Sequence, residues 1–498
     1  MMRRTLLFPV FVMVSAWSIP FAEAQTVPGS REERQVNCTG ALSFDEALLM
    51  MLGENPALEA AEYEEQAARQ ERHAATGLFF PTVSVGGSYA YMEKDIALNV
   101  DLEEYKPGLQ NGISQLLPAL DPQLQQAVGG LLGPLMGQPW NFSRTIQDRE
   151  FGLVGGTVTM PVFMGGKIVA ASRAARINEQ LVHEQTAQTR NALVSELVER
   201  YFGYVFALQV VEVRQMVVDG VRRHLDDALA LERNGMIAAS ERLYVEFKVA
   251  EAERELEDAR VQLETIRSAL GGTLGGPVDA IPATALFVLD EIEPQVHFRQ
   301  LARDCNPLLN QVEYKHQLAH QNVRVRRAEF FPQVVAVGAG SVRDWQVMDM
   351  MPRWFVGVGV NLKIFDGLHR EYKYAAARQT ERRVGALKQK AGNDVGLLVE
   401  SLYNAMLNCR NRLGSIESSM TFAEEYLKSK DAAYRAGMSP STEMIDAELN
   451  LAKVRIEHMQ AAYNFDVALA KLLEAAGVSD AFADYMHRPD ARSIRFGE

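Results

Sequence analysis

Cysteine is scarce in this chain. Its 498 residues include three, Cys38, Cys305 and Cys409. An odd number cannot all pair internally, which excludes a dense disulfide framework. Cys38 and Cys305 lie near the starts of two related segments and are candidates for a bridge, but spacing gives no distance, so the sequence leaves this open. Cys409 lies in a helical stretch and is expected to be a buried thiol.

Basic residues are also in deficit. Lys and Arg number 51 against 64 Asp and Glu, a formal net charge of −13 at pH 7, which argues against a nucleic-acid partner. Catalytic motifs are missing too. The chain has no G-x-S-x-G and no CxxC, and "HEQTA" at 183–187 has Ala187 where a zinc motif needs its second histidine. The nine histidines are scattered. We therefore expect no enzymatic activity, no cofactor and no metal site.

Long apolar runs are missing beyond the first residues. No later segment approaches the ~20 apolar residues that a spanning helix needs. The first residues are a basic start, an apolar stretch and "AEA", the pattern of a secretory signal peptide at 1–24 that is cut after Ala24. Pro9 and Pro20 interrupt the stretch and argue against an anchor. An exported chain without a spanning helix is either soluble or a membrane β-barrel.

An internal duplication is what the chain does contain. The stretch "ENPALEAAEYEEQAARQERHAATGLFFP" (54–81) shares Asn-Pro, Glu-Tyr and Phe-Phe-Pro, in the same positions, with "CNPLLNQVEYKHQLAHQNVRVRRAEFFP" (305–332). Further on, "PVFMGGK" (161–167) corresponds to "KIFDGLH" (363–369). "ERNGM" (232–236) then corresponds to "YRAGM" (434–438) at the same spacing. Spacing kept over such a distance indicates two copies of one unit.

Each copy predicts the same series of elements. A capping asparagine followed by proline starts a helix, which the Phe-Phe-Pro proline ends. Alternating residues then predict a strand, followed by a second strand that is clearer in the second copy, at 354–364. Long helices follow at 167–233 and 369–435. Gly235 or Gly437 turns the chain, and the return helices end near 270 and 476.

These elements divide the chain into five parts. The signal peptide (1–24) is followed by an N-terminal segment (25–42). The first structural repeat (43–285) contains helices, a β-hairpin with a long extracellular loop at 92–150, and a pair of long helices. The second repeat (286–480) has the same plan, and a C-terminal tail (481–498) ends the chain. "GGTLGGP" at 271–277 lacks the Gly-Lys-Ser/Thr ending of a phosphate loop and is interpreted as the linker.

The lengths of these elements constrain the architecture. A helix over 167–233 would be about 100 Å long at about 1.5 Å per residue, so it needs other long helices beside it. Strands of about ten residues can cross a tilted bilayer. Aromatic residues lie at the helix end of the strands and at the far end: Phe79, Phe80, Phe163, Phe330, Phe331 and Phe365, then Tyr89, Tyr91, Phe151, Trp345 and Trp354. A soluble sandwich with aromatic corners is the alternative that the strands alone allow.

Each Phe-Phe-Pro is interpreted as a junction at the membrane interface, with Phe79, Phe80, Phe330 and Phe331 as interface aromatics. Four strands per chain cannot close a barrel, and open edges are costly in hydrocarbon. The chain is therefore expected to oligomerise, with two copies giving eight strands and three giving twelve.

With its repeated Asn-Pro starts, Phe-Phe-Pro junctions and the stretch "TEMIDAELNLAKVRIE" (442–457), the chain resembles the TolC-like outer-membrane efflux family over 42–477. The resemblance implies a mixed α/β membrane protein, mainly α, in which duplicated units build a long periplasmic α-helical barrel and a transmembrane β-barrel of twelve strands in a homotrimer. A mixed belt of linker and terminal segments would surround the middle. The implied location is the outer membrane, in contact with its lipid, extending into the periplasm, with a periplasmic adaptor and an inner-membrane transporter as partners.

The resemblance also implies site residues. Glu443 and Asp446 match the two carboxylates of an acidic ring at the periplasmic entrance, which would raise the local cation concentration. Glu241 and Tyr434 match members of an entrance latch. The arginine that completes this latch falls on Ser439, and Arg435 and Arg242 are the two candidates to replace it. Without the family pattern, the carboxylates would be exposed acids at a helix end.

The implied function is an exit duct for small molecules such as drugs and toxic compounds. Metal efflux and type I protein secretion are alternatives within this class, and a trimeric coiled-coil tether or adhesin is an alternative outside it. The sequence has no Met or His cluster near the expected entrance, so it gives no reason there to favour metal ions as the cargo. The loop at 92–150, with a short helix expected at 121–132, is expected either to cover the pore or to fold into its mouth.

Overall fold

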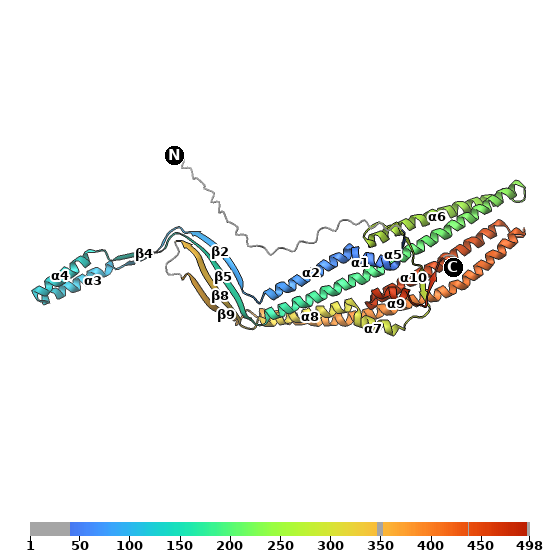
Figure 1. Cartoon of the computed structure of the whole chain (residues 1–498). Coiled ribbons are helices and arrows are strands. Elements are labelled where there is room, and N and C mark those ends of the chain that lie inside the picture. The colour runs from blue at the N-terminus through green and yellow to red at the C-terminus, as the bar shows by residue number, and fades with distance from the viewer. Residues whose placement is uncertain (1–39, 346–351, 437, 496–498) are drawn as a thin grey trace, which may run out of the picture.

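The computed structural model describes residues 40–345, 352–436 and 438–495. The expected signal peptide, residues 25–39, Cys38 and the turn glycine Gly437 lie outside the described residues. The described chain is elongated. A curved sheet lies between a bundle of long helices on one side and a narrow extension on the other (Figure 1).

Eight of the described α-helices form two sets of four with matching lengths. The first set is α1 (Phe44–Glu54), α2 (Pro56–Gly77), α5 (Lys167–Arg233) and α6 (Ala239–Leu274). The second is α7 (Gln295–Cys305), α8 (Pro307–Ala328), α9 (His369–Arg435) and α10 (Ser441–Ala476). Each set has helices of 11, 22, 67 and 36 residues, so the duplication is visible in the fold. No helix in the described ranges has the length and apolar content needed to cross a membrane.

The two Asn-Pro pairs connect the start of one helix to the end of another. Asn55 caps α2, because its side-chain oxygen accepts hydrogen bonds from two backbone N–H groups of the first turn. Its side-chain amide donates to the carbonyl of Thr273 at the end of α6 (N···O 2.9 Å). Asn306 caps α8 and donates to the carbonyl of Ala475 at the end of α10 (2.7 Å). Each repeated asparagine therefore both begins a helix and fixes the end of the return helix.

Four antiparallel strands form one sheet: β2 (Thr82–Tyr91), β5 (Glu150–Met164), β8 (Gln333–Trp345) and β9 (Trp354–Asn361). Their order is β2-β5-β8-β9, so each copy contributes a pair of adjacent strands, as expected, and β2 and β9 are the edge strands. β9 ends at Asn361, short of the expected Ile364. The reason is that Asn361 pairs with Gln333, the first residue of β8, so the following residues have no partner strand.

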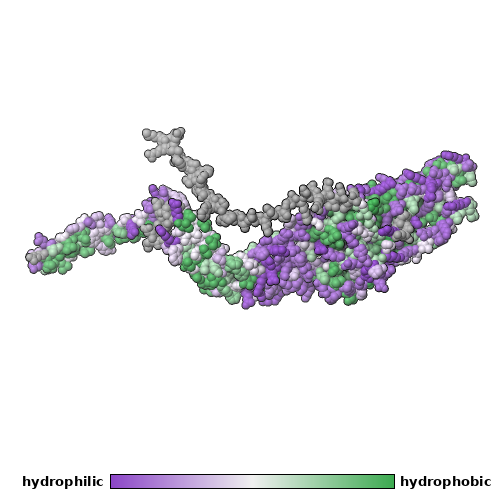
Figure 2. Space-filling model, viewed as in Figure 1, coloured by the Kyte–Doolittle hydropathy of each residue, from purple (hydrophilic) through white to green (hydrophobic). Residues whose placement is uncertain are grey.

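The two faces of this sheet differ in polarity. One face carries exposed apolar side chains: Val83, Val85, Val158, Met160, Val356, Val358 and Val360. The other face carries smaller and more polar ones, among them Ser84 and Thr157, whose hydroxyls are 3.3 Å apart. Figure 2 shows hydrophobic residues gathered over the sheet and hydrophilic ones over the adjoining helices.

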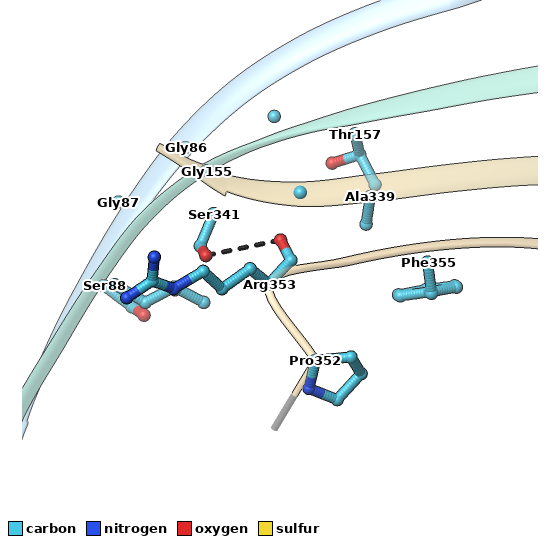
Figure 3. A pocket seen from close by; sticks show the side chains of 13 residues that line it. Gly86, Gly87, Ser88, Gly155, Thr157, Ala339, Ser341, Pro352, Arg353 and Phe355 are labelled. Carbon is cyan, nitrogen blue, oxygen red and sulfur yellow. Dashed lines mark hydrogen bonds between the residues drawn. The ribbon is translucent and has the colours of Figure 1, made fainter. Parts of the chain in front are cut away.

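The more polar face curls around a hollow of about 600 Å³ (Figure 3). Glycines of β2, β5 and β8 line much of it: Gly86, Gly87, Gly155, Gly156 and Gly340. A Cβ on Gly155 would lie 2.6 Å from the carbonyl oxygen of Gly340, so the close approach of β5 to β8 requires glycine there. At the edge of the hollow, the hydroxyl of Ser341 donates to the carbonyl of Arg353 (3.3 Å).

Residues 92–150 form a hairpin with two helices between its strands rather than an irregular loop. β3 (Ile96–Asp101) pairs with β4 (Asn141–Gln147), and α3 (Lys106–Leu116) and α4 (Pro122–Gly137) lie between them. α4 extends five residues past the helix expected at 121–132. The hairpin extends away from the sheet, opposite the long helices (Figure 1), so in this chain it does not fold back into the sheet.

The largest buried side chains gather around the middle of α5. Rings from four segments pack there: Phe44, Tyr201, Phe202, Phe287 and Phe482. They connect α5 with α1, with β7 (Leu286–Leu289) and with α11 (Phe482–Met486). β7 pairs with β10 (Ala491–Ile494), and β1 (Ala41–Leu42) pairs with β6 (Ile281–Pro282). Linker and terminal segments thus pack together beside the middle of α5, and a belt around the assembled helices stays a prediction.

Two of the three cysteines lie in the described residues, and both are free thiols. Cys305 is exposed at the end of α7. Cys409, expected to be buried, is half-buried on α9, and this burial raises the pKa of its thiol.

Asp466 is a fully buried carboxyl group on α10. One of its oxygens accepts a long hydrogen bond from the backbone N–H of Phe287 (3.4 Å), and the other has no hydrogen-bond partner among the described residues. Burial raises the pKa of Asp466 well above its usual value, and the bond from Phe287 offsets only part of this. The folded chain therefore holds a proton that the unfolded chain releases above about pH 4.

We expect Asp466→Asn to stabilise the protein increasingly as the pH rises. Because the folded-state pKa of Asp466 is raised, its contribution to stability is most favourable below the unfolded pKa near 4 and declines as the pH rises toward the folded pKa, by about 1.4 kcal/mol for each unit of the shift. The asparagine side chain does not titrate, so the stability of the variant lacks this pH dependence. Thermal melts of both proteins at pH 4.5, 6 and 8 measure the effect, and a Tm difference that stays constant with pH would contradict it.

Candidate channel entrance

Two helix–turn–helix tips lie at the end of the molecule farthest from the sheet (Figure 1). α5 turns back into α6 at 234–238, and α10 begins at Ser441, a few residues after α9 ends at Arg435. Gly235 has a φ of 67°, a left-handed conformation that suits glycine after a helix end. In the second turn, the N–H of Met438 donates to the carbonyl of Ala433 (2.9 Å). The tips thus place the starts of α6 and α10, with all four expected entrance residues, at this end.

Glu443, expected in the acidic ring, is bound by two groups of its own chain. Nζ of Lys430 on α9 donates to Oε2 of Glu443 (2.6 Å), and the hydroxyl of Ser439 donates to the same oxygen (2.8 Å). Both bonds, that from Lys430 first, lower the pKa of Glu443, so this carboxylate stays ionised further into the acid range. Glu443 in turn raises the pKa of Lys430. Ser439, where the resemblance would put the latch arginine, thus donates its hydroxyl to Glu443.

Asp446, the second expected ring residue, is exposed one turn further along α10. Residues three apart on a helix lie on neighbouring positions of one face, so Asp446 and Glu443 point to the same side. Asp446 helps to raise the pKa of Lys248 on α6, after the larger effects of Glu251 and Tyr244. Asp446 is therefore an exposed carboxylate with a lysine of the first copy in its neighbourhood.

Tyr434, expected in the latch, lies against α5. Its ring meets that of His224 edge-on, with centroids 5.9 Å apart. Both line a groove of about 670 Å³ between α5, α9 and α10. Nε2 of His224 lies 3.4 Å from Oε1 of Glu448 on α10. Burial, and to a lesser degree the charge of Asp227, raises the pKa of Tyr434. Tyr434 thus lies where the two helix pairs of the chain meet.

Glu241, the other expected latch residue, is in the first turn of α6, where the helix dipole favours negative charge. The two candidate replacement arginines have carboxylate partners within the chain. Arg242 pairs with Glu232 of α5 (2.8 Å), and Arg435 pairs with Asp431 of α9 (3.0 Å). A latch between chains would have to compete with these pairs, and the latch stays a prediction.

The four phenylalanines of the Phe-Phe-Pro junctions are partly exposed where the helices meet the sheet: Phe79, Phe80, Phe330 and Phe331. The guanidinium of Arg370 lies over the ring of Phe330, 5.2 Å from its centre, so Phe330 also packs within the chain. Aromatic rings at the border of an apolar sheet surface are typical of a membrane interface, and this role also stays a prediction.

Sequence reasoning missed three residues that contact or lie near the candidate entrance residues: Lys430, His224 and Glu448. Their contacts connect separate helices, Lys430 with Glu443 across a turn and His224 with Glu448 between the two copies. Sequence spacing reveals partners that lie three or four residues apart on one helix. Neither the Lys430–Glu443 pair nor the His224–Glu448 pair has that spacing. Among the described residues, no group of three or more His, Cys, Asp or Glu side chains is placed to hold a metal ion.

The architecture, a four-stranded sheet joined to two pairs of long helices in a duplicated order, is that of TolC-like outer-membrane channels. A family model described as "Outer membrane efflux protein" matches residues 48–276 and 298–478. The chain belongs to this outer membrane efflux protein family, so it is a protein of the outer membrane that extends into the periplasm. Members of the family are trimeric ducts, not enzymes, that act with adaptor and inner-membrane pump partners.

Individual proteins resemble the chain more distantly. The cobalt-zinc-cadmium resistance protein CzcC of Cupriavidus metallidurans is 23% identical over 363 residues, which are 69% of this chain and 82% of that protein. The CmeC outer membrane channel of Campylobacter jejuni has a TM-score of 0.68 and 13% identity, covering 88% of this chain and 86% of that one. The open-state MtrE outer membrane channel of Neisseria gonorrhoeae has a TM-score of 0.66 and 15% identity, covering 88% and 89%. At these identities, the likeness to the two channels establishes the fold.

Proposed function

We propose that three copies of this chain form the outer-membrane exit duct of a tripartite efflux system. The observation that carries the proposal is the open four-stranded sheet with an exposed apolar face and edge strands β2 and β9. An unpaired strand edge costs several kcal/mol per group in hydrocarbon. Continuing the sheet with β2 and β9 of neighbouring copies removes these edges, and three copies give twelve strands. The long helices then line a passage through the periplasm toward an adaptor and an inner-membrane transporter.

In this arrangement the helix tips form the entrance, and Glu443 and Asp446 of all copies surround its axis. Carboxylates converging on one axis raise the local cation concentration. Both residues are exposed at the start of α10, as a ring of this kind requires. Glu241 and Tyr434 act in the latch that keeps the entrance closed. The duct itself performs no catalytic step.

The experiment is block of the purified channel by multivalent cations in planar bilayers. Wild-type protein is expected to be a trimer in detergent and to conduct. Glu443→Ala with Asp446→Ala should weaken the block at least tenfold, because two carboxylates per chain are lost. The wild type measured at high salt is the control, since screening should weaken its block in the same direction. Unchanged block in the double variant would remove these residues from the entrance, and a monomer without conductance would end the duct proposal.

Small organic molecules such as drugs are the cargo proposed first. Divalent metal ions are the second candidate, and the relative named for cobalt-zinc-cadmium resistance favours them. A strain that lacks its own duct, supplied with this chain and the transporter that co-purifies with it, separates the two. Restored resistance to hydrophobic drugs alone supports the first cargo, and restored resistance to cobalt, zinc and cadmium alone supports the second.

Two other functions remain as alternatives. Export of proteins through a type I secretion system would use the same duct, and the transporter that co-purifies with the chain distinguishes it. A trimeric coiled-coil tether or adhesin would need long helices but no passage. Conductance in bilayers therefore separates the duct from the tether.

A further inference from the structure

Lys430 differs from a neighbouring lysine in the position of its partner. Lys428 pairs with Glu425 (3.6 Å), three residues away on α9, and its side chain is 79% exposed. Lys430 reaches across the turn to Glu443 in the first turn of α10 (2.6 Å), and its side chain is 26% exposed. In an exposed ion pair within one helix, each charged group readily exchanges its partner for water, so the pair contributes little. The Lys430–Glu443 pair instead joins two helices at the end of the chain that bears the entrance residues.

Further contacts hold this pair in place. Nζ of Lys430 lies 5.5 Å from the centre of the Tyr426 ring, within the range of a cation–π interaction. On the carboxylate side, the Ser439 hydroxyl donates to the oxygen of Glu443 that also binds Lys430. The ammonium therefore has a ring on one side and a carboxylate on the other, and the carboxylate has a second donor. These contacts favour the charged forms of both side chains and hold the ammonium of Lys430 beside the carboxylate of Glu443.

We propose that Lys430 sets the strength of the acidic ring by neutralising Glu443 in each chain, so that Asp446 supplies the net charge of the entrance. This inference rests on the proposed function, because it takes both carboxylates to surround the axis. With Lys430 present, each chain contributes one net negative charge there instead of two. A ring of lower charge binds multivalent cations less tightly, so a cationic cargo or a stray metal ion passes without being retained.

The test compares block of single channels by hexaamminecobalt(III), a trivalent complex that does not exchange its ligands and so reports charge alone. Lys430→Gln should tighten the block about tenfold, because one more unit charge per chain faces the ion within about a Debye length. Lys430→Arg keeps the charge and should resemble the wild type. Lys428→Gln is the matched control on the same helix and should change the block less than twofold. Glu443→Gln added to Lys430→Gln should return the block to the wild-type value.

Each result has one meaning. Tighter block in Lys430→Gln that is reversed by Glu443→Gln establishes the inference. If Asp446→Asn weakens the block while Lys430→Gln leaves it unchanged, the acidic ring stands and the role of Lys430 is wrong. If Asp446→Asn also has no effect, the carboxylates do not line the entrance and the proposed site fails. Conductance measured without the cobalt complex verifies that each variant folds and assembles. If Lys430→Gln does not assemble, Lys430→Met takes its place, because methionine keeps an apolar side chain over the Tyr426 ring.

Discussion

Val85→Arg is expected to prevent the folded oligomer from accumulating in the outer membrane. Val85 lies on β2 in the apolar face of the sheet, and it is 77% exposed in the single chain. If this face meets lipid, a guanidinium there costs roughly 2–4 kcal/mol per chain near the middle of the bilayer. Each copy of an oligomer bears the same penalty. The measurement is the amount of heat-resistant oligomer in outer-membrane fractions on unboiled gels.

Ser84→Arg is the matched control for this prediction. Ser84 precedes Val85 on the same strand, and its side chain therefore points to the other face, where its hydroxyl lies 3.3 Å from that of Thr157. If this face lines a water-filled passage, arginine there keeps its hydration. The control should assemble normally and change conductance instead. Equal assembly of both variants would show that the face bearing Val85 does not meet lipid. Failure of Ser84→Arg alone would mean that the Ser84 face meets lipid and the Val85 face lines the passage.

The sequence predicted the long-range plan of this fold better than its local details. The 67-residue helices α5 and α9 have the bounds expected from the repeated motifs, because tight turns and glycines mark their ends. The predicted end of β9 was wrong. The alternating pattern continues to Ile364, but the partner strand β8 begins only at Gln333, which pairs with Asn361. Pairing between strands decides that boundary, and a single strand's pattern does not contain it.

The same limit applies to the candidate entrance. Glu443 and Asp446 could be selected from the sequence by their position after a turn, but the residues that surround them could not be predicted. Lys430 approaches Glu443 because α9 and α10 are antiparallel and their turn has a particular geometry. The charge at this end of the chain therefore depends on two helices together. Residue spacing along either helix overestimates it by counting each carboxylate as free.

Gly165→Ala is expected to destabilise the protein by roughly 2–4 kcal/mol through overpacking and backbone strain. Gly165 directly follows the last residue of the strand β5 and has a φ of 64°. A Cβ there would lie 2.5 Å from the carbonyl oxygen of Ala328 and 2.9 Å from Cβ of Phe331. The motif "PVFMGGK" of the first copy thus packs directly on the Phe-Phe-Pro junction of the second. Chemical denaturation of the detergent-solubilised protein, followed by helical circular dichroism, measures the loss.

Gly166→Ala separates the two causes. Gly166 also has a left-handed φ, 88°, but a Cβ there would meet no atom of the described residues within 4 Å. The corresponding position of the second copy is Leu368, which adopts a φ of 65° with a full side chain, so this conformation tolerates residues other than glycine. Gly166→Ala should therefore cost about 1 kcal/mol or less. Comparable losses in both variants would mean that conformation alone selects glycine here, and that the contact between the two copies at Gly165 contributes nothing measurable to their joining.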